Sequence, residues 1–380
     1  MAMNHLLSQI KQRFSTDPTL VQVILGPRQV GKTTAIHDFL SFYKKPSLYF
    51  TTEESDYSTL WLEACWQKAV QNSPETLLVI DEIQKIEQWS ETLKKLWDQQ
   101  KRLKKTKIKV LLLGSSSLEI QKNLSESLTG RFELIRAYHW SFDESKDIFK
   151  IKFSDYVKYG GYPGSYQFLS DRPRFNQFIK SSIVETVIDK DILKFQHVRS
   201  PALFRQTFDL LMSYPAQEIS YTKLLGQLQD KGNTDLVKSF IRLFESAFLI
   251  KEIKKYTNKA YLEKSSSPKI IPLCNALVSE KYKTDDPDMT GRLYEAMVGA
   301  ELVKCFGDVY YWRQASYEVD YVVEVGTRLY AIEVKSGRKK NSKGLELFRN
   351  EFKKAQLVWI DSTNIFEFLQ SPEEFFKKLN

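Results

Sequence analysis

Strand-length apolar runs alternate with segments of helical pattern between residues 20 and 142. Most of these runs contain few polar positions, which is typical of strands buried on both faces of a parallel sheet. The segments between them carry apolar residues at helical spacing. The pattern predicts an α/β fold with a covered, mostly parallel sheet, with strands at 21–25, 47–50, 76–80 and 109–113 and helices at 34–42, 57–71 and 87–100.

The first strand leads directly into a glycine-rich loop with the spacing G-x-x-x-x-G-K-T. Glycines let the backbone curl so that its N–H groups and the next helix N-terminus face phosphate oxygens. In this pattern the lysine reaches the β and γ phosphates, and the threonine hydroxyl helps to hold Mg²⁺. An ordinary glycine turn is the alternative, which the flanking strand and helix disfavour. We therefore expect a loop that binds ATP, made by Gly26, Pro27, Arg28, Gln29, Val30, Gly31, Lys32, Thr33 and Thr34.

The strands at 76–80 and 109–113 are also followed by polar residues. We expect Asp81 to hold Mg²⁺ and Glu82 to polarise the attacking water, because both follow the strand at 76–80. Ser115 and Ser116 follow the strand at 109–113 and would sense the γ-phosphate or cap the following helix.

Arg131 precedes the last strand of this region on an expected sheet edge. An arginine there can serve as a finger on the γ-phosphate held by a neighbouring subunit. A plain surface arginine remains the alternative.

The middle of the chain is helical. Residues 175–195 have helical spacing, and residues 201–256 predict three helices and a trailing strand, which resemble a winged helix. Such a fold often lays its third helix in the DNA major groove, where Lys238 and Arg242 would face phosphates. A spacer that packs against protein is an equal alternative.

Residues 316–337 predict a β-hairpin with a two-residue turn at Gly326 and Thr327. Counting outward from this turn places Asp320 opposite Glu333, and Lys335 shares the face of Glu333. Opposed carboxylates repel unless a cation or proton joins them. Mg²⁺ bound by these acids, with Lys335 beside the attacking water, would suit phosphodiester hydrolysis.

Composition narrows the class of protein. The chain has 380 residues, 42% hydrophobic content and a net charge of +9, which favours a folded protein with polyanionic partners such as nucleic acid. Its three cysteines are far apart and indicate neither a disulfide framework nor a zinc site. With no signal peptide and no apolar run of membrane-spanning length, we expect a cytoplasmic protein that does not bind membranes.

The motifs GPRQVGKTT, LLVIDE, LLLGSSS, LTGRF and YGGYPG together resemble bacterial and archaeal AAA-type P-loop ATPases related to the STAND and origin-recognition groups. The resemblance implies an extra strand between the two nucleotide motifs. It also implies a helical lid beside the nucleotide, opened at Gly160, Gly161 and Pro163, and assembly into a ring or partial ring.

Asp320 followed by Glu333-x-Lys335 resembles the PD-(D/E)xK, or restriction-endonuclease-like, fold. Glu295 in the preceding helix matches the extra acid of that family and would join Asp320 and Glu333 as a metal ligand. A fold retained as a DNA clamp or spacer, without cleavage, is the alternative. The neighbouring basic residues would suit a DNA backbone, namely Arg338, Lys339, Lys340 and Lys343.

These patterns predict four parts: an ATPase core at 1–150, a helical lid at 151–199, a winged-helix-like part at 200–264 and an α/β nuclease-like part at 268–380. The function they favour is an ATP-driven homo-oligomer, with six subunits as our expectation, that remodels duplex or branched DNA and binds or cuts it. One rival is a STAND-like switch that signals to a protein partner and has an inert C-terminal domain. Another is a metal-dependent nuclease gated by ATP.

Overall fold

The computed structural model describes residues 5–52, 57–114, 117–194, 196, 198–228, 233–258, 266–279, 287–337 and 343–379. The chain forms two compact units. Unit 1 comprises Met1–Tyr138 and Asp189–Gln196, and unit 2 comprises His139–Ile188 and His197–Asn380. The chain thus leaves unit 1 after Tyr138 and returns to it for a short segment before it enters unit 2 again.

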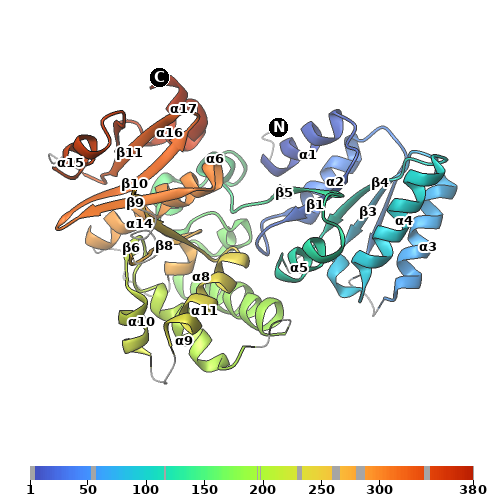
Figure 1. Cartoon of the computed structure of the whole chain (residues 1–380), viewed down its shortest axis with the longest axis horizontal. Coiled ribbons are helices and arrows are strands. Elements are labelled where there is room, and N and C mark those ends of the chain that lie inside the picture. The colour runs from blue at the N-terminus through green and yellow to red at the C-terminus, as the bar shows by residue number, and fades with distance from the viewer. Residues whose placement is uncertain are drawn as a thin grey trace. The chain divides into compact units, whose positions relative to one another are not determined.

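Unit 1 is built on a parallel sheet of five strands in the order β2-β3-β4-β1-β5 (Figure 1). The strands are β1 (Val21–Leu25), β2 (Ser47–Thr51), β3 (Leu77–Asp81), β4 (Lys109–Leu113) and β5 (Phe132–Arg136). Every residue of β1, β3 and β4 is buried. The predicted parallel sheet is therefore confirmed, and β4 lies between the strands that carry the two nucleotide motifs.

Helices connect successive strands of unit 1 as the pattern predicted, and one further helix precedes β1. They are α1 (His5–Ser15), α2 (Lys32–Phe42), α3 (Thr59–Asn72), α4 (Trp89–Leu103) and α5 (Ser117–Ser127), with a short 3₁₀ turn η1 (Ile83–Lys85). Helix α1 packs on α2, and α3 packs on α4. Because the carboxyl ends of parallel strands lie on one side of a sheet, the loops after β1, β3 and β4 meet there.

Unit 2 begins with short helices: α6 (Phe142–Phe149), α7 (Phe153–Tyr159), η2 (Pro163–Phe168), α8 (Arg172–Gln177) and the π-helical η3 (Phe178–Glu185). A further π-helical segment, η4 (Val187–Leu193), carries the chain back into unit 1. The expected helical character of 175–195 is confirmed over the described positions.

Gly160 and Gly161 lie inside unit 2, where they serve close packing. A Cβ on Gly160 would lie 2.4 Å from Cys274 Sγ, and one on Gly161 would lie 2.0 Å from the Trp140 carbonyl oxygen. The role of these glycines as a lid opening beside the nucleotide stays a prediction.

The strands of unit 2 form one sheet. Its order is β12-β11-β10-β9-β7-β8-β6. The strands are β6 (Gln217–Glu218), β7 (Ile250–Lys255), β8 (Lys269–Pro272), β9 (Val309–Gln314), β10 (Tyr317–Val325), β11 (Arg328–Val334) and β12 (Gln356–Ile360). The helices are α9 (Pro201–Leu211), α10 (Tyr221–Gln227), α11 (Thr234–Ser246), α13 (Ala276–Ser279), α14 (Pro287–Phe306), α15 (Lys343–Glu351), α16 (Ile365–Gln370) and α17 (Pro372–Lys378).

This shared sheet joins the segments at 200–264 and 268–380, which the sequence suggested as separate parts. Strand β7 pairs with β8 on one side and with β9 on the other. The four-part division stays a prediction.

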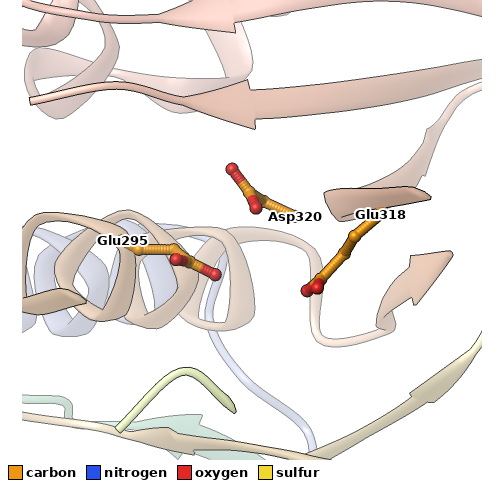
Figure 2. Close-up of side chains that lie close together, drawn as sticks. All are labelled: Glu295, Glu318 and Asp320. Atoms are coloured by element: carbon orange, nitrogen blue, oxygen red, sulfur yellow. The ribbon is translucent and has the colours of Figure 1, made fainter. Parts of the chain in front are cut away.

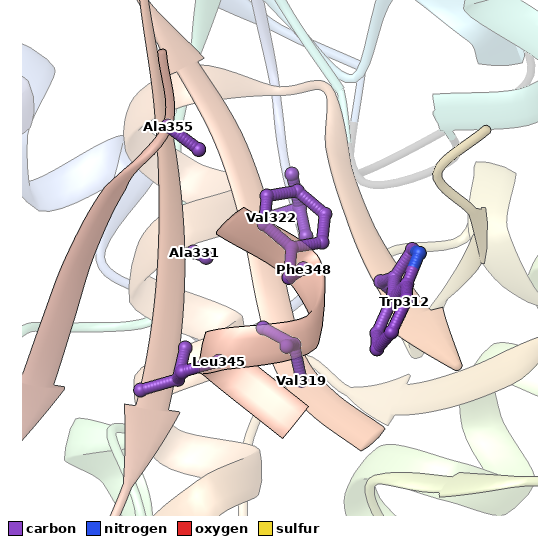
Figure 3. Close-up of a cluster of buried hydrophobic side chains, with 7 residues drawn as sticks. All are labelled: Trp312, Val319, Val322, Ala331, Leu345, Phe348 and Ala355. Atoms are coloured by element: carbon purple, nitrogen blue, oxygen red, sulfur yellow. The ribbon is translucent and has the colours of Figure 1, made fainter. Parts of the chain in front are cut away.

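Two helices cover opposite faces of the C-terminal strands. Figure 3 shows Leu345 and Phe348 of α15 over a buried cluster that includes Val322 of β10 and Ala331 of β11. On the other face, Gly299 lets α14 approach Tyr321, because a Cβ there would lie 2.4 Å from the Tyr321 hydroxyl oxygen. Among the described helices, none is long and apolar enough to span a membrane.

Candidate functional site

The glycine-rich loop of unit 1 ends in a helix whose N-terminus is open. Gly31 takes a left-handed conformation (φ 83°) and precedes α2, and no side chain caps the helix there. A left-handed φ favours glycine. The first backbone N–H groups of α2 are therefore available to an anion.

Lys32 lies within the loop that precedes it. Its Nζ donates to the carbonyl oxygens of Gly26 at 3.0 Å and Pro27 at 2.7 Å. Burial lowers the pKa of Lys32 to about 8, although the carboxylates of Glu82 and Asp81 act in the opposite direction. The hydrogen-bond partners of this ammonium are thus neutral carbonyl oxygens.

Asp81 links the two nucleotide motifs at the carboxyl ends of the parallel strands. Its Oδ2 accepts a hydrogen bond from the Thr33 hydroxyl at 2.9 Å and one from the Tyr49 hydroxyl at 2.8 Å. Its Oδ1 accepts from the backbone N–H of Glu82 at 2.9 Å. Tyr49 comes from the neighbouring strand β2, and no sequence motif marks it.

Glu82 has a strained backbone, with φ of 55° in the left-handed region. Its carboxylate accepts a hydrogen bond from the side-chain amide of Gln84, and a Cβ on Gly114 would lie 2.1 Å from Gln84 Oε1. Gln84 thus connects Glu82 to the end of β4. No sequence motif indicated Gln84. Ser115 and Ser116, the expected γ-phosphate sensors, lie outside the described residues.

A long-range ion pair holds Arg28 of the loop. Its Nε and one terminal nitrogen contact the two carboxylate oxygens of Asp191 at 2.6 and 2.5 Å. Asp191 belongs to the segment that returns to unit 1, and its side chain is 5% exposed. No sequence pattern indicates this partner, which lies 163 positions away.

Arg131 forms an ion pair within the chain itself. It lies just before the edge strand β5, and its guanidinium makes a bidentate ion pair with Asp98 of α4 at 2.9 and 3.0 Å. Its role as a finger toward a neighbouring subunit stays a prediction.

In unit 2, the register of the predicted hairpin is confirmed. Strands β10 and β11 pair Val325 with Arg328 and Tyr321 with Ile332. The pairing of β10 with β9, however, shifts between Val319 and Val322, which indicates a β-bulge. Val319 and Val322 both belong to the cluster under α15 although they are three positions apart. No sequence pattern indicates this bulge.

Asp320, which lies where the register of β10 shifts, belongs to a group of three carboxylates. Glu295 of α14 and Glu318 and Asp320 of β10 each offer an oxygen within 4.8 Å of the others (Figure 2). Asp320 Oδ2 also accepts from the backbone N–H of Val334 at 2.7 Å. Glu295 and Asp320 were expected here, whereas Glu318 was missed.

A fully buried lysine lies between these acids. Lys269 of β8 is 0% exposed, and its Nζ is 2.5 Å from Glu295 Oε1 and 3.0 Å from Glu318 Oε1. It also donates to the Asp320 carbonyl oxygen at 3.2 Å. Burial lowers the pKa of Lys269, but Glu295, Asp320 and Glu318 outweigh this effect and raise it well above its ordinary value. Sequence reasoning missed Lys269, which no motif includes.

Glu333 and Lys335 form a pair beside this cluster. Lys335 Nζ lies 2.5 Å from Glu333 Oε1, and Glu333 Oε2 is buried with no hydrogen-bond partner among the described residues. Burial and the nearby Asp320 raise the pKa of Glu333 to about 7. Arg338, Lys339 and Lys340 lie outside the described residues.

Comparison with known families divides the chain into three matched segments. Residues 19–146 match the family described as "AAA domain". They are an AAA-type domain. Residues 150–280 and 290–373 each match a domain of unknown function, DUF8612 and DUF4143 respectively.

Two relatives that match most of the chain are uncharacterized proteins and indicate no activity. An uncharacterized protein of Methanocaldococcus jannaschii is 22% identical over 340 residues, covering 80% of this chain and 72% of that protein. An uncharacterized protein of Mycobacterium tuberculosis is 25% identical over 326 residues, covering 83% of this chain and 70% of that protein.

Solved structures similar to the chain are distant. The Thermotoga maritima RuvB Holliday junction branch migration motor has a TM-score of 0.34 at 13% identity, covering 68% of this chain and 92% of that one. The Aeropyrum pernix ORC1 protein in complex with DNA has a TM-score of 0.32 at 10% identity, covering 80% and 94%.

The AAA domain fits ATP and Mg²⁺. An uncapped helix N-terminus and the Lys32 ammonium suit phosphate oxygens, and the Thr33 and Asp81 oxygens suit Mg²⁺. The carboxylate cluster of unit 2 fits a metal ion less well, because an ammonium already lies among its oxygens.

Proposed function

We propose that the AAA domain binds ATP with Mg²⁺ and hydrolyses it. The observation that carries the proposal is the hydrogen bond between Thr33 and Asp81, 2.9 Å long, with Glu82 as the next residue. It brings the phosphate-binding loop and the acidic strand end to one point, as phosphoryl transfer to water requires.

Each residue has a distinct part in this proposal. Backbone N–H groups of α2 and the Lys32 ammonium bind the phosphate chain, and Thr33 and Asp81 would hold the metal, which supplies charge neutralisation at the phosphates when bound. Glu82 orients the attacking water by accepting a hydrogen bond from it. Gln84 donates to the Glu82 carboxylate and keeps it in position.

Steady-state ATPase assays test this proposal. Glu82→Gln should lower kcat by about 10² or more while ATP still binds, and Lys32→Ala should abolish binding. Glu91→Gln, which changes an exposed acid of α4, is the matched control and should behave as the wild type. Full activity of Glu82→Gln would refute the assignment of the water-orienting residue.

We further propose that ATP hydrolysis acts on duplex or branched DNA. The net charge of +9 supports this, as does a run of exposed basic residues at the end of α4, comprising Lys101, Arg102, Lys104, Lys105 and Lys107. The order α9-β6-α10-α11-β7-β8, with β8 between β6 and β7, also suits a winged helix. A phosphate backbone attracts such surfaces.

DNA-stimulated ATPase activity separates this proposal from a switch that signals to a protein partner. A DNA-remodelling protein should hydrolyse ATP several-fold faster with duplex or branched DNA, whereas a switch should not respond. Arg242→Glu on α11 should weaken DNA binding, and Arg205→Glu on α9 serves as the control because both arginines are exposed. Equal DNA binding by both variants would remove α11 from the proposed interface.

We propose a homo-oligomer, with a hexamer as the working size, in which Arg131 reaches a neighbouring subunit's nucleotide. Its position before an edge strand supports this. In mixed oligomers, Arg131→Ala subunits should slow wild-type neighbours. Slowing of only the mutant subunits would refute the finger.

A further inference from the structure

The carboxylates of unit 2 surround a cation that belongs to the chain itself. Glu295 reaches the cluster from α14, Glu318 and Asp320 reach it from β10, and Lys269 enters from β8 (Figure 2 shows the three acids). Its Nζ lies 2.5 Å from Glu295 Oε1, 3.0 Å from Glu318 Oε1 and 3.2 Å from the Asp320 carbonyl oxygen.

A divalent ion shared by these oxygens would need the same position. Mg²⁺ binds oxygens at about 2.0–2.1 Å and Ca²⁺ at about 2.3–2.6 Å, so an ion shared by Glu295 and Glu318 would need the space between their oxygens that Nζ now occupies. An ammonium and a divalent ion cannot share that point, because of both their size and their charge.

Lys269 has little freedom to leave. Its side chain is 0% exposed, and its Nζ lies 5.1 Å from the centre of the Tyr321 ring, a distance suited to a cation–π contact. Its strand β8 is hydrogen-bonded to β7 on one side and β6 on the other, so the backbone at this point is fixed. Withdrawal of the ammonium would leave these partly buried carboxylates without their cation.

We propose that Lys269 is the permanent cation of this cluster and takes the place of a divalent metal. The cluster is then a structural ion network that ties β8 to α14 and β10, and it supports no metal-dependent cleavage of DNA. This inference does not depend on ATP hydrolysis by the AAA domain.

Titration with Mn²⁺, followed by the electron paramagnetic resonance signal of the free ion, tests the proposal. The full chain is used without nucleotide and with Asp81→Asn, which removes the metal ligand of the AAA domain. The chain with Lys269 should show no Mn²⁺ site that depends on Asp320. Lys269→Ala should create one site per chain, at least about tenfold tighter than any background binding, and adding Asp320→Asn should remove it.

Lys304→Ala is the matched control. Lys304 is also a largely buried lysine of unit 2, but it pairs with the single carboxylate of Glu301 at 2.7 Å. Its loss exposes no carboxylate cluster, so Mn²⁺ binding should not change. A circular dichroism spectrum of each variant confirms folding.

Two results would overturn the proposal. One is a Mn²⁺ site in the chain that keeps Lys269, lost on Asp320→Asn. The other is a folded Lys269→Ala chain that still binds no Mn²⁺. If Lys269→Ala fails to fold, acetylation of native lysines read by mass spectrometry decides instead: Lys269 should stay unmodified with or without millimolar Mg²⁺, and Mg²⁺-dependent modification would contradict the proposal.

Discussion

Lys32 and Lys269 both lie among oxygen atoms, but the two surroundings affect their charge in opposite ways. At Lys32 the contacts are neutral carbonyls, and burial lowers the pKa to about 8. At Lys269 the contacts include two carboxylates, and despite burial the pKa lies well above its ordinary value. A cation held by neutral groups can serve a charged ligand, whereas one surrounded by acids is already neutralised.

The largest expected difference is in stability. Lys269→Met should lower the free energy of unfolding by about 3 kcal/mol, the low end for breaking a buried ion pair, because it leaves partly buried carboxylates without their cation. Lys32→Met should change it by only about 1–2 kcal/mol, since it removes two hydrogen bonds to carbonyls, yet it should abolish ATP binding. Urea denaturation of both variants checks this. Equal losses of stability would contradict the comparison.

A smaller loss is expected at the Arg28–Asp191 pair. Asp191→Asn should lower the free energy of unfolding of unit 1 by about 1.5–3 kcal/mol, because it breaks a bidentate ion pair whose acid is nearly buried. Asp189→Asn, at an exposed acid of the same segment, is the control and should have a minor effect.

A double-mutant cycle with Arg28→Met isolates the pair. If the pair accounts for the loss, the two single changes should not add. Additive losses would show that Asp191 stabilises unit 1 by some other contact. The cycle also tests whether the returning segment is tied to the phosphate-binding loop, since Asp191 is its contact with Arg28.

The lowered pKa of Lys32 predicts a pH dependence of ATP binding. A neighbouring triphosphate favours the charged amine, so above a pH of about 8 binding requires uptake of a proton. The Kd for ATP should therefore rise up to about tenfold per pH unit above this value and stay flat below it. A fluorescent ATP analogue measures this. Lys32→Arg should bind without the dependence, because arginine stays charged; a dependence that persists in this variant would refute the assignment.

Local patterns in the sequence predicted much of unit 1. Buried strands, a loop of defined spacing and acids at a strand end are encoded within a few residues, and β1, β3 and β4 follow them. The hairpin register was also predictable, because a two-residue turn fixes it.

What the sequence did not reveal depends on residues far apart or on irregular backbone. Lys269 precedes Glu295, Glu318 and Asp320 without any shared motif, and it meets them only because β8 joins the same sheet as β10. The bulge in β10 depends on its pairing with β9. Asp191 meets Arg28 only through the return of the chain to unit 1. Such contacts follow from tertiary structure, which periodicity does not encode.

The smallest expected effect concerns the pair of Arg131 and Asp98, which provides a baseline for Lys32 and Lys269. Both side chains are about one-third exposed, at 30% and 35%, so water competes for the charges and salt screens them. Asp98→Ala should therefore leave the unfolding midpoint within measurement error at any salt concentration. A clear, salt-dependent loss would show that this surface pair stabilises unit 1, and burial would then no longer explain why Lys269 matters more. If Arg131 acts on a neighbouring subunit, the same variant should still assemble and hydrolyse ATP, since only the intramolecular partner of Arg131 is lost.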